Sequence, residues 1–216
     1  KLTSPPMKLE KNLLKLGIRA EEITKVFFTH LHFDHIGWAL DFKTKKPFFV
    51  NAEYLVPSKE WNYWEKCDDP IRFDHINSFN TNFKEIINFN QLSLIDENQP
   101  ITKNISTFPT PGHTPGHTSL IISSNHIKGY ITGDVFHSPA QFTNPDWSHR
   151  ADINSEMAIK TRKNFLKKLT GEEIIAAGHL DPVSYTHLRA NETREERGVG
   201  RMGGLNKREV GGGGGG

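Results

Sequence analysis

A short cluster of histidines near the start of the chain restricts its fold more than any other feature. Residues 29–37 read THLHFDHIG, so three histidines and an aspartate fall between His30 and His35. The apolar run before them predicts a strand, and alternate residues of a strand share a face, which lets His30 and His32 converge on one ion. Asp34 and His35 follow where the strand gives way to a loop, and we expect them to turn toward a second ion. The segment therefore predicts a metal site.

Three later segments supply further nitrogen and oxygen donors, the atoms that zinc takes from imidazole and carboxylate groups. Residues 110–118 read TPGHTPGHT, in which two Pro-Gly pairs predict tight turns. We take His113 as a ligand and expect His117 to support the ligands or pack the loop. Asp134 closes the predicted strand GYITGD, where a carboxylate can bridge two cations. His179 follows the predicted strand IIAA, again just past a strand end.

Predicted strands and helices are interleaved along the first part of the chain. Helical patterns occur at residues 9–16, in pieces over 58–90, and over 155–169, where Ser155 is the expected N-cap. Strands are expected at residues 23–29, 52–56, 105–109, 119–123, 127–132 and 174–177. This mixture indicates an α/β or α+β domain.

The composition changes near Val183. Residues 184–216 hold more than half of the glycines, end in a run of six, and lack Phe, Trp and Ile. We therefore expect a folded domain at residues 1–183 and a disordered tail at 184–216, interpreted as non-native sequence, with a native flexible arm as the alternative. The tail also supplies the net charge of +2, so the domain is balanced and lacks the basic excess of a nucleic-acid binder.

Taken together, the ligand segments over residues 8–182 resemble the metallo-β-lactamase superfamily. The resemblance implies an α+β fold, a four-layer αββα sandwich with two metals at one edge between the sheets. Because only 29 residues precede His30 and the native-looking part ends soon after His179, we expect the sandwich to be truncated at both ends, with N-terminal strands missing. The implied ligands are His30, His32 and His113 for the first ion, Asp34, His35 and His179 for the second, and Asp134 as the bridge.

Two longer segments, NAEYLVPSKEWNYW and GDVFHSPAQFTNPDW, are similar to the branch that contains acyl-homoserine-lactone lactonases and methyl parathion hydrolase. The resemblance implies a dinuclear metal-dependent hydrolase, in which a hydroxide shared by the two ions attacks a lactone or ester carbonyl. Asp134 and Asp34 are the expected catalytic carboxylates, with Asp34 moving a proton to the leaving group. Zinc is the expected metal, with manganese or iron as alternatives. A phosphotriester hydrolase, or a sulfur oxygenase of this fold with one iron, are the alternative functions.

Four further residues are candidates for the second shell of the site or for a substrate pocket. Trp61, Trp64 and Phe136 could form an apolar wall over the metals, with ordinary core packing as the alternative. His137 could hydrogen-bond a ligand or substrate, or be a plain loop residue. The expected partner is a small ester or lactone, with neither nucleic acid nor membrane, and a homodimer is left open. Cys67, the single cysteine, favours a reducing compartment, so we expect a cytoplasmic protein, with a lost N-terminal signal as the alternative.

Overall fold

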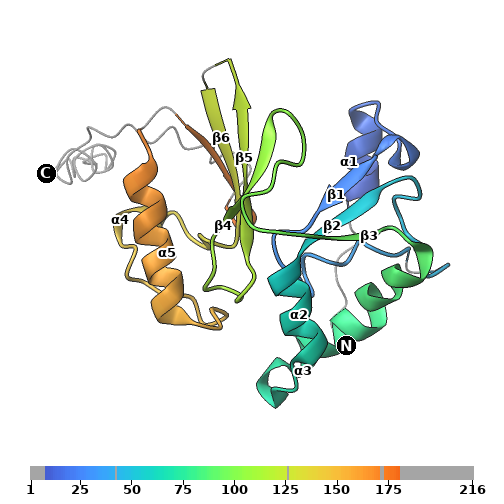
Figure 1. Cartoon of the computed structure of the whole chain (residues 1–216), viewed down its shortest axis with the longest axis horizontal. Helices are drawn as coiled ribbons and strands as arrows, with labels where there is room; N and C mark the ends of the chain where they lie inside the picture. Colours follow the sequence, from blue (N-terminus) through green and yellow to red (C-terminus); the bar gives the residue numbers. More distant parts are fainter. Residues whose placement is uncertain (1–7, 42, 126, 171–172, 181–216) are drawn as a thin grey trace, which may run out of the picture.

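The computed structural model describes residues 8–180 apart from residues 42, 126, 171 and 172. Its strands form two sheets, one of three strands and one of four. Helix α5 (Ser155–Lys168) covers the four-stranded sheet, and helix α2 (Ser58–Lys66) lies on the side of the three-stranded sheet (Figure 1). Helices thus lie on both sides of the paired sheets, which confirms the predicted α+β sandwich. The proposed tail falls outside the described residues.

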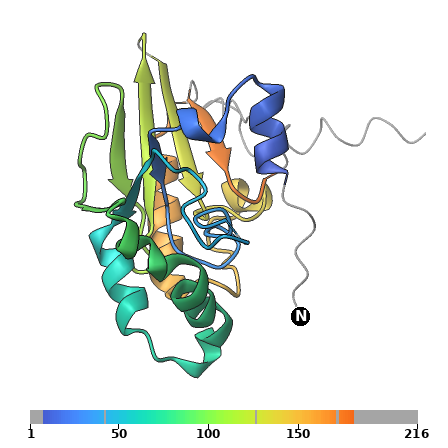
Figure 2. The ribbon, with the colours of Figure 1, turned by 90° about the vertical axis from the view of Figure 1, so that its right-hand side faces the viewer.

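The three-stranded sheet is parallel and has the order β1-β2-β3. Its strands are β1 (Lys25–Phe27), β2 (Glu53–Pro57) and β3 (Leu92–Ile95). Before it come α1 (Leu9–Lys15) and the short η1 (Ala20–Glu22). The helical pieces expected over residues 58–90 are present and gather at one end of the strands in both views (Figure 1, Figure 2). They are α2, η2 (Pro70–Arg72), α3 (Phe73–Ser78), η3 (Phe79–Phe83) and η4 (Lys84–Phe89).

The four-stranded sheet has the order β4-β5-β6-β7 and mixes strand directions. Strands β4 (Ile105–Pro109), β5 (Thr118–Ser124) and β6 (Ile127–Gly133) are antiparallel, whereas β7 (Ile174–Ala177) runs parallel to β6. The short helix α4 (Ala140–Thr143) precedes α5. The N-cap of α5 is Asn154, whose side chain accepts from the backbone N–H of Met157, and not Ser155 as predicted. The apolar face of α5 packs Phe165 against Tyr130 of the sheet.

Two aromatic clusters fill the sides of the sandwich. The residues that were candidates for a substrate wall belong to these clusters. Trp61 and Trp64 are buried in the core beside the three-stranded sheet, and Phe136 is buried in the core under α5. All three side chains are buried in these cores, and the ring of Trp64 also contacts that of His32 at a centroid distance of 5.5 Å. No helix within the described ranges is long and apolar enough to cross a bilayer.

The ends of the strands bring the ligand segments to one edge of the sandwich. His30 to His35 follow β1, residues 110–117 join β4 to β5, Asp134 follows β6, and His179 follows β7. Because β6 and β7 are parallel neighbours, their carboxyl ends lie together. One expectation was wrong: β1 ends at Phe27, so His30 and His32 lie in the loop after the strand, and strand alternation does not explain their convergence.

Candidate metal centre

The loop between β4 and β5 packs closely against the helices on both sides of it. A Cβ on Gly112, whose φ is +136°, would lie 2.3 Å from the backbone nitrogen of Ala158 in α5. A Cβ on Gly116 would lie 2.1 Å from the backbone nitrogen of Glu60 in α2. Only glycine permits such approaches, so the two Pro-Gly pairs seat the loop that carries His113 between α5 and α2.

The first ligand set unites His30, His32 and His113. Ligand atoms of these three residues all lie within 4.8 Å of one another. The Nε2 atom of His113 lies 2.8 Å from Nδ1 of His32. All three side chains are buried, and burial lowers the pKa of His30 and of His32 below the ordinary histidine value. Both rings are therefore neutral near pH 7, the form in which imidazole binds a metal.

The second ligand set unites Asp34, His35 and His179, again with ligand atoms within 4.8 Å of one another. The Oδ2 atom of Asp34 lies 3.5 Å from Nε2 of His35 and 3.6 Å from Nε2 of His179. The side chains of Asp34 and His179 are 39% and 40% exposed, whereas that of Asp134 is 2% exposed. The centre is thus closed on the side of the first set and open to solvent on the side of the second.

Asp134 lies between the two sets. Its Oδ2 is 3.3 Å from Nε2 of His113 in the first set and 2.9 Å from Nε2 of His179 in the second. Its Oδ1 is 3.3 Å from Nε2 of His35. Burial alone would raise the pKa of Asp134, but its interactions with the surrounding histidine rings, chiefly those of His113, His137 and His179, outweigh burial and hold that pKa far below the ordinary range. The residue is therefore a carboxylate whose Oδ2 lies near donors of both sets and whose Oδ1 lies near His35 of the second set.

The donor atoms fit a pair of zinc ions. Two atoms bound tetrahedrally to zinc at about 2.0–2.1 Å lie roughly 3.4 Å apart. The distances between neighbouring donors here run from 2.8 Å, between His113 and His32, to 3.7 Å, between Nε2 of His30 and Oδ2 of Asp134. In addition, Nε2 of His30, Nε2 of His35 and Oδ1 of Asp134 are buried and have no hydrogen-bond partner among the residues that the structure describes. Unpaired buried polar atoms are costly, and a cation between them would remove that cost.

His117 has both ring nitrogens engaged by protein groups. Its Nε2 accepts from the backbone N–H of Asp134 at 3.1 Å, so Nδ1 carries the proton and donates to Oγ1 of Thr110 at 2.8 Å. Burial lowers the pKa of His117 to about 3. This histidine therefore holds the His113 loop and the backbone of Asp134 in place, which is the supporting role expected from the sequence.

His137 lies closer to the centre than a plain loop residue would. Its Nε2 is 3.2 Å from Oδ2 of Asp134, and its Nδ1 is buried without a hydrogen-bond partner in the described part of the chain. The ring stacks between His149 and His179, with centroid distances of 4.1 Å and 5.1 Å. His113, Asp134 and His137 also form a set that could hold an ion. His137 thus adds a donor beside the bridge.

A buried network that the sequence did not reveal fixes the orientation of His113. The Nδ1–H of His113 donates to Oδ1 of Asp152 at 3.0 Å, which leaves Nε2 as the nitrogen that faces the centre. Oδ2 of Asp152 accepts from Ser148, from the backbone of His149 and from the fully buried Arg162. Burial would raise the pKa of Asp152, but these hydrogen bonds lower it. A ligand histidine that donates to a carboxylate is the usual arrangement in zinc sites.

His75 is a second functional candidate that sequence reasoning missed. It belongs to α3, and its ring centroid lies 4.1 Å from that of His32 and 4.9 Å from that of Phe33. The ring is half-buried, and none of the described residues forms a hydrogen bond with its Nδ1. No motif surrounds this histidine in the sequence, so only the packing of α3 against the ligand loop identifies it.

Comparison with known proteins agrees with this geometry. A family model described as the metallo-β-lactamase superfamily matches residues 2–179. The chain belongs to the metallo-β-lactamase superfamily. All seven predicted ligands fall within the matched residues and lie together in the structure.

Two proteins similar to this member of the metallo-β-lactamase superfamily are named lactonases. An N-acyl homoserine lactonase of Bacillus sp is 28% identical over 171 residues, which cover 78% of this chain and 60% of that protein. AidC, a dizinc quorum-quenching lactonase, is 30% identical, with a TM-score of 0.67 over 78% of this chain and 62% of that one. The hydrolase AbOPH, 23% identical, has a TM-score of 0.72 over 81% of this chain and 62% of its own, which supports the fold alone. The chain thus spans about 60% of the length of the curated relatives it matches.

Proposed function

We propose that this chain forms the metal-binding part of a hydrolase that opens an acyl-homoserine lactone or a related carboxylic ester. The observation that carries the proposal is the position of Asp134, a buried carboxylate with donors of both ligand sets within 3.3 Å. A single-iron oxygenase would leave the second set of donors without a use. The lactone substrate is supported by the names of the relatives at 28% and 30% identity.

The residues present fit two divalent ions: His30, His32 and His113 would hold one, Asp34, His35 and His179 the other, and Asp134 would contact both. Bound as a pair, zinc ions supply hydroxide at neutral pH and polarise a carbonyl group. Asp134 remains ionised because of its low pKa and neutralises part of the metal charge.

The open side of the centre determines where a substrate can approach. Asp34 and His179 are the partly exposed ligands, so the ester group enters from their side. Asp34 reaches solvent and is placed to take up a proton and return it to the leaving oxygen of the opened ring. The Nδ1 atoms of His137 and His75 have no hydrogen-bond partner within the described ranges and can hydrogen-bond the polar part of the substrate.

The test combines metal analysis with hydrolysis assays on two substrates, N-hexanoyl-homoserine lactone and a paraoxon-type phosphotriester. The protein is purified without chelator, its metals are counted by elemental analysis, and hydrolysis of N-hexanoyl-homoserine lactone is followed by proton release. We expect two ions per chain and lactone opening. We further expect Asp134→Asn to lose most metal and turnover, whereas Asp146→Asn, the same change at a carboxylate that is 66% exposed, should lose neither.

Two results would contradict the proposal. One iron per chain without hydrolysis of either substrate would favour the oxygenase alternative. Faster cleavage of a paraoxon-type phosphotriester than of the lactone would retain the hydrolase but reject the substrate class.

A further inference from the structure

Glu60 is a fully buried carboxylate in the first turn of α2, and the chemistry described above does not use it. Its Oε1 accepts from the backbone N–H of Leu31 at 2.9 Å and from Nε1 of Trp64 at 2.6 Å. Its Oε2 accepts from the hydroxyl of Thr114 at 2.6 Å and from the backbone N–H of Gly116 at 3.2 Å. Three of these four partners can only donate, so an ionised carboxylate satisfies all of them.

The partners of Glu60 are the neighbours of the first ligand set. Leu31 stands between His30 and His32, and Thr114 directly follows His113. These two loops come from opposite sheets of the sandwich, one after β1 and the other between β4 and β5. One side chain thus ties together the two backbone segments whose spacing fixes the three histidines.

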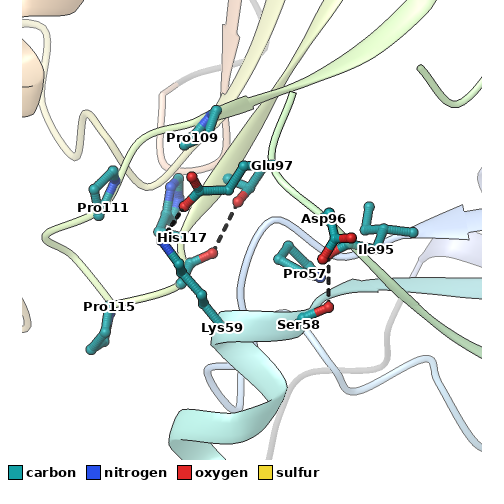
Figure 3. A pocket seen from close by; sticks show the side chains of 12 residues that line it. Pro57, Ser58, Lys59, Ile95, Asp96, Glu97, Pro109, Pro111, Pro115 and His117 are labelled. Atoms are coloured by element: carbon teal, nitrogen blue, oxygen red, sulfur yellow. Dashed lines mark hydrogen bonds and ion pairs between the residues drawn. The ribbon is translucent and has the colours of Figure 1, made fainter. Parts of the chain in front are cut away.

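Close packing between α2 and the His113 loop restricts changes in the distance between this loop and the His30–His32 loop. Figure 3 shows Pro115 and His117 of the loop beside Ser58 and Lys59 at the start of α2. The space between them is a hollow of about 60 Å³. Beneath it the backbones of Gly116 and Glu60 are in contact, as the glycine position requires.

The groups around this position explain why a carboxylate stands here. An apolar side chain would leave the N–H groups of Leu31, Trp64 and Gly116 buried without their acceptor, which is costly. An apolar side chain cannot replace a group that accepts hydrogen bonds from both loops at once.

We infer that Glu60 is a positioning residue for the first metal: it sets the distance between the His30–His32 loop and the His113 loop by accepting hydrogen bonds from both. This inference rests on the proposed metal binding. It predicts that a change at Glu60 weakens one metal site selectively and leaves the other, made by Asp34, His35 and His179, nearly unchanged.

The test is a stepwise cobalt titration of the parent protein and of the Glu60→Gln variant in the presence of a competing chelator. The visible absorption of the bound cobalt reports each binding step. Whichever way the amide is turned, its NH₂ group faces at least one N–H group of Leu31, Trp64 or Gly116. We expect one binding step to weaken roughly 10- to 100-fold, the range for residues that orient metal ligands, and the other to change by less than about threefold. In a His179→Ala background, where only the first set is intact, the weakening should persist. In a His113→Ala background it should disappear.

A control separates positioning from loss of stability. Phe79→Leu reduces packing against Trp61 in the same core but removes none of the four hydrogen bonds of Glu60, so it should lower the melting temperature and leave both binding steps in place. If Glu60→Gln does not fold, Thr114→Val removes one of the four hydrogen bonds and should still weaken the same step, by roughly 3- to 10-fold.

The outcomes are distinct. A parent protein that binds no metal rejects the proposed function itself. A parent that binds two ions, together with a folded Glu60→Gln or Thr114→Val variant that binds both as tightly, rejects the role of Glu60 alone. Equal weakening of both steps also rejects it, because it indicates general loosening of the fold.

Discussion

Replacing Asp152 with asparagine should weaken the first metal site through the proton on His113. Asparagine keeps the size of the side chain but turns one oxygen into an NH₂ group that only donates. If this group faces His113, the ring must accept at Nδ1 and carry its proton on Nε2, the nitrogen that faces the centre. If it faces the other way, it opposes the N–H of His149 and the guanidinium of Arg162. Neither orientation keeps all of the bonds.

The expected magnitude follows from the bond that is lost. A hydrogen bond to a charged group contributes about 1.5–3 kcal/mol, or roughly 10- to 150-fold in a binding constant. We therefore expect Asp152→Asn to bind zinc at the set of His30, His32 and His113 roughly 10- to 100-fold more weakly. Competition with a chelator of known affinity measures this, and circular dichroism checks that the variant is folded.

A neighbouring residue provides the matched control. Ser148 donates to the other oxygen of Asp152 and does not contact His113. Ser148→Ala should therefore change zinc affinity by less than about threefold, although it removes a buried hydrogen bond of the same carboxylate. A folded Asp152→Asn protein with the parental zinc affinity would refute the argument that Asp152 fixes the protonated nitrogen of His113.

Three further predictions concern the surroundings of the centre. Arg162→Met removes the buried cation beside Asp152 and should reduce the free energy of unfolding by about 3–5 kcal/mol in a urea titration; a loss below about 1 kcal/mol would contradict it. Gly133→Ala should lower the melting temperature, because φ is +53° and a Cβ would lie 2.7 Å from Oγ1 of Thr29; an unchanged value would show that the turn can relax. Stripping zinc with a chelator should lower the melting temperature, since a ligand at 100 times its Kd stabilises by about 2.7 kcal/mol per site; no shift would mean that the folded chain does not hold the metal.

The sequence predicted most of the strands and missed one. The segments predicted at residues 105–109 and 174–177 coincide with β4 and β7. Strand β3 (Leu92–Ile95) was missed although it is as long as β7; Ser93 interrupts its apolar residues, whereas the sequence IIAA of β7 is unbroken. Ser155 was preferred over Asn154 as the N-cap of α5, although both types cap helices, because a one-residue shift leaves the periodicity intact.

The candidate ligands could be recognised in the sequence because their chemistry is concentrated in a few short segments. The residues that orient them were not, since their partners are distant in sequence. Glu60 accepts from Leu31, 29 positions away, and from Gly116, 56 positions away. Asp152 accepts from His113, 39 positions away. Such contacts exist only once the chain has folded, and that between Glu60 and Gly116 also requires the two sheets to have packed. No local pattern encodes them.

The reason for the convergence of His30 and His32 also changes with the structure. Strand alternation would have oriented both side chains by local geometry, but β1 ends at Phe27. The loop is instead fixed at Leu31 by a carboxylate from α2. Tertiary contacts thus determine the position of these histidines. A substitution in α2 can therefore shift them without any change in the ligand motif.

Each ligand set takes residues from both sheets, and this ties the metal centre to the sandwich as a whole. His30 and His32 follow β1 in one sheet, whereas His113 follows β4 in the other. The second set likewise joins Asp34 and His35 to His179 after β7. A metal bound by either set would therefore cross-link the two halves, and the loss of a metal should loosen the junction between the sheets before it loosens either sheet. Hydrogen exchange with and without zinc should accordingly show protection concentrated in the ligand loops and the first turn of α2, where Glu60 connects them.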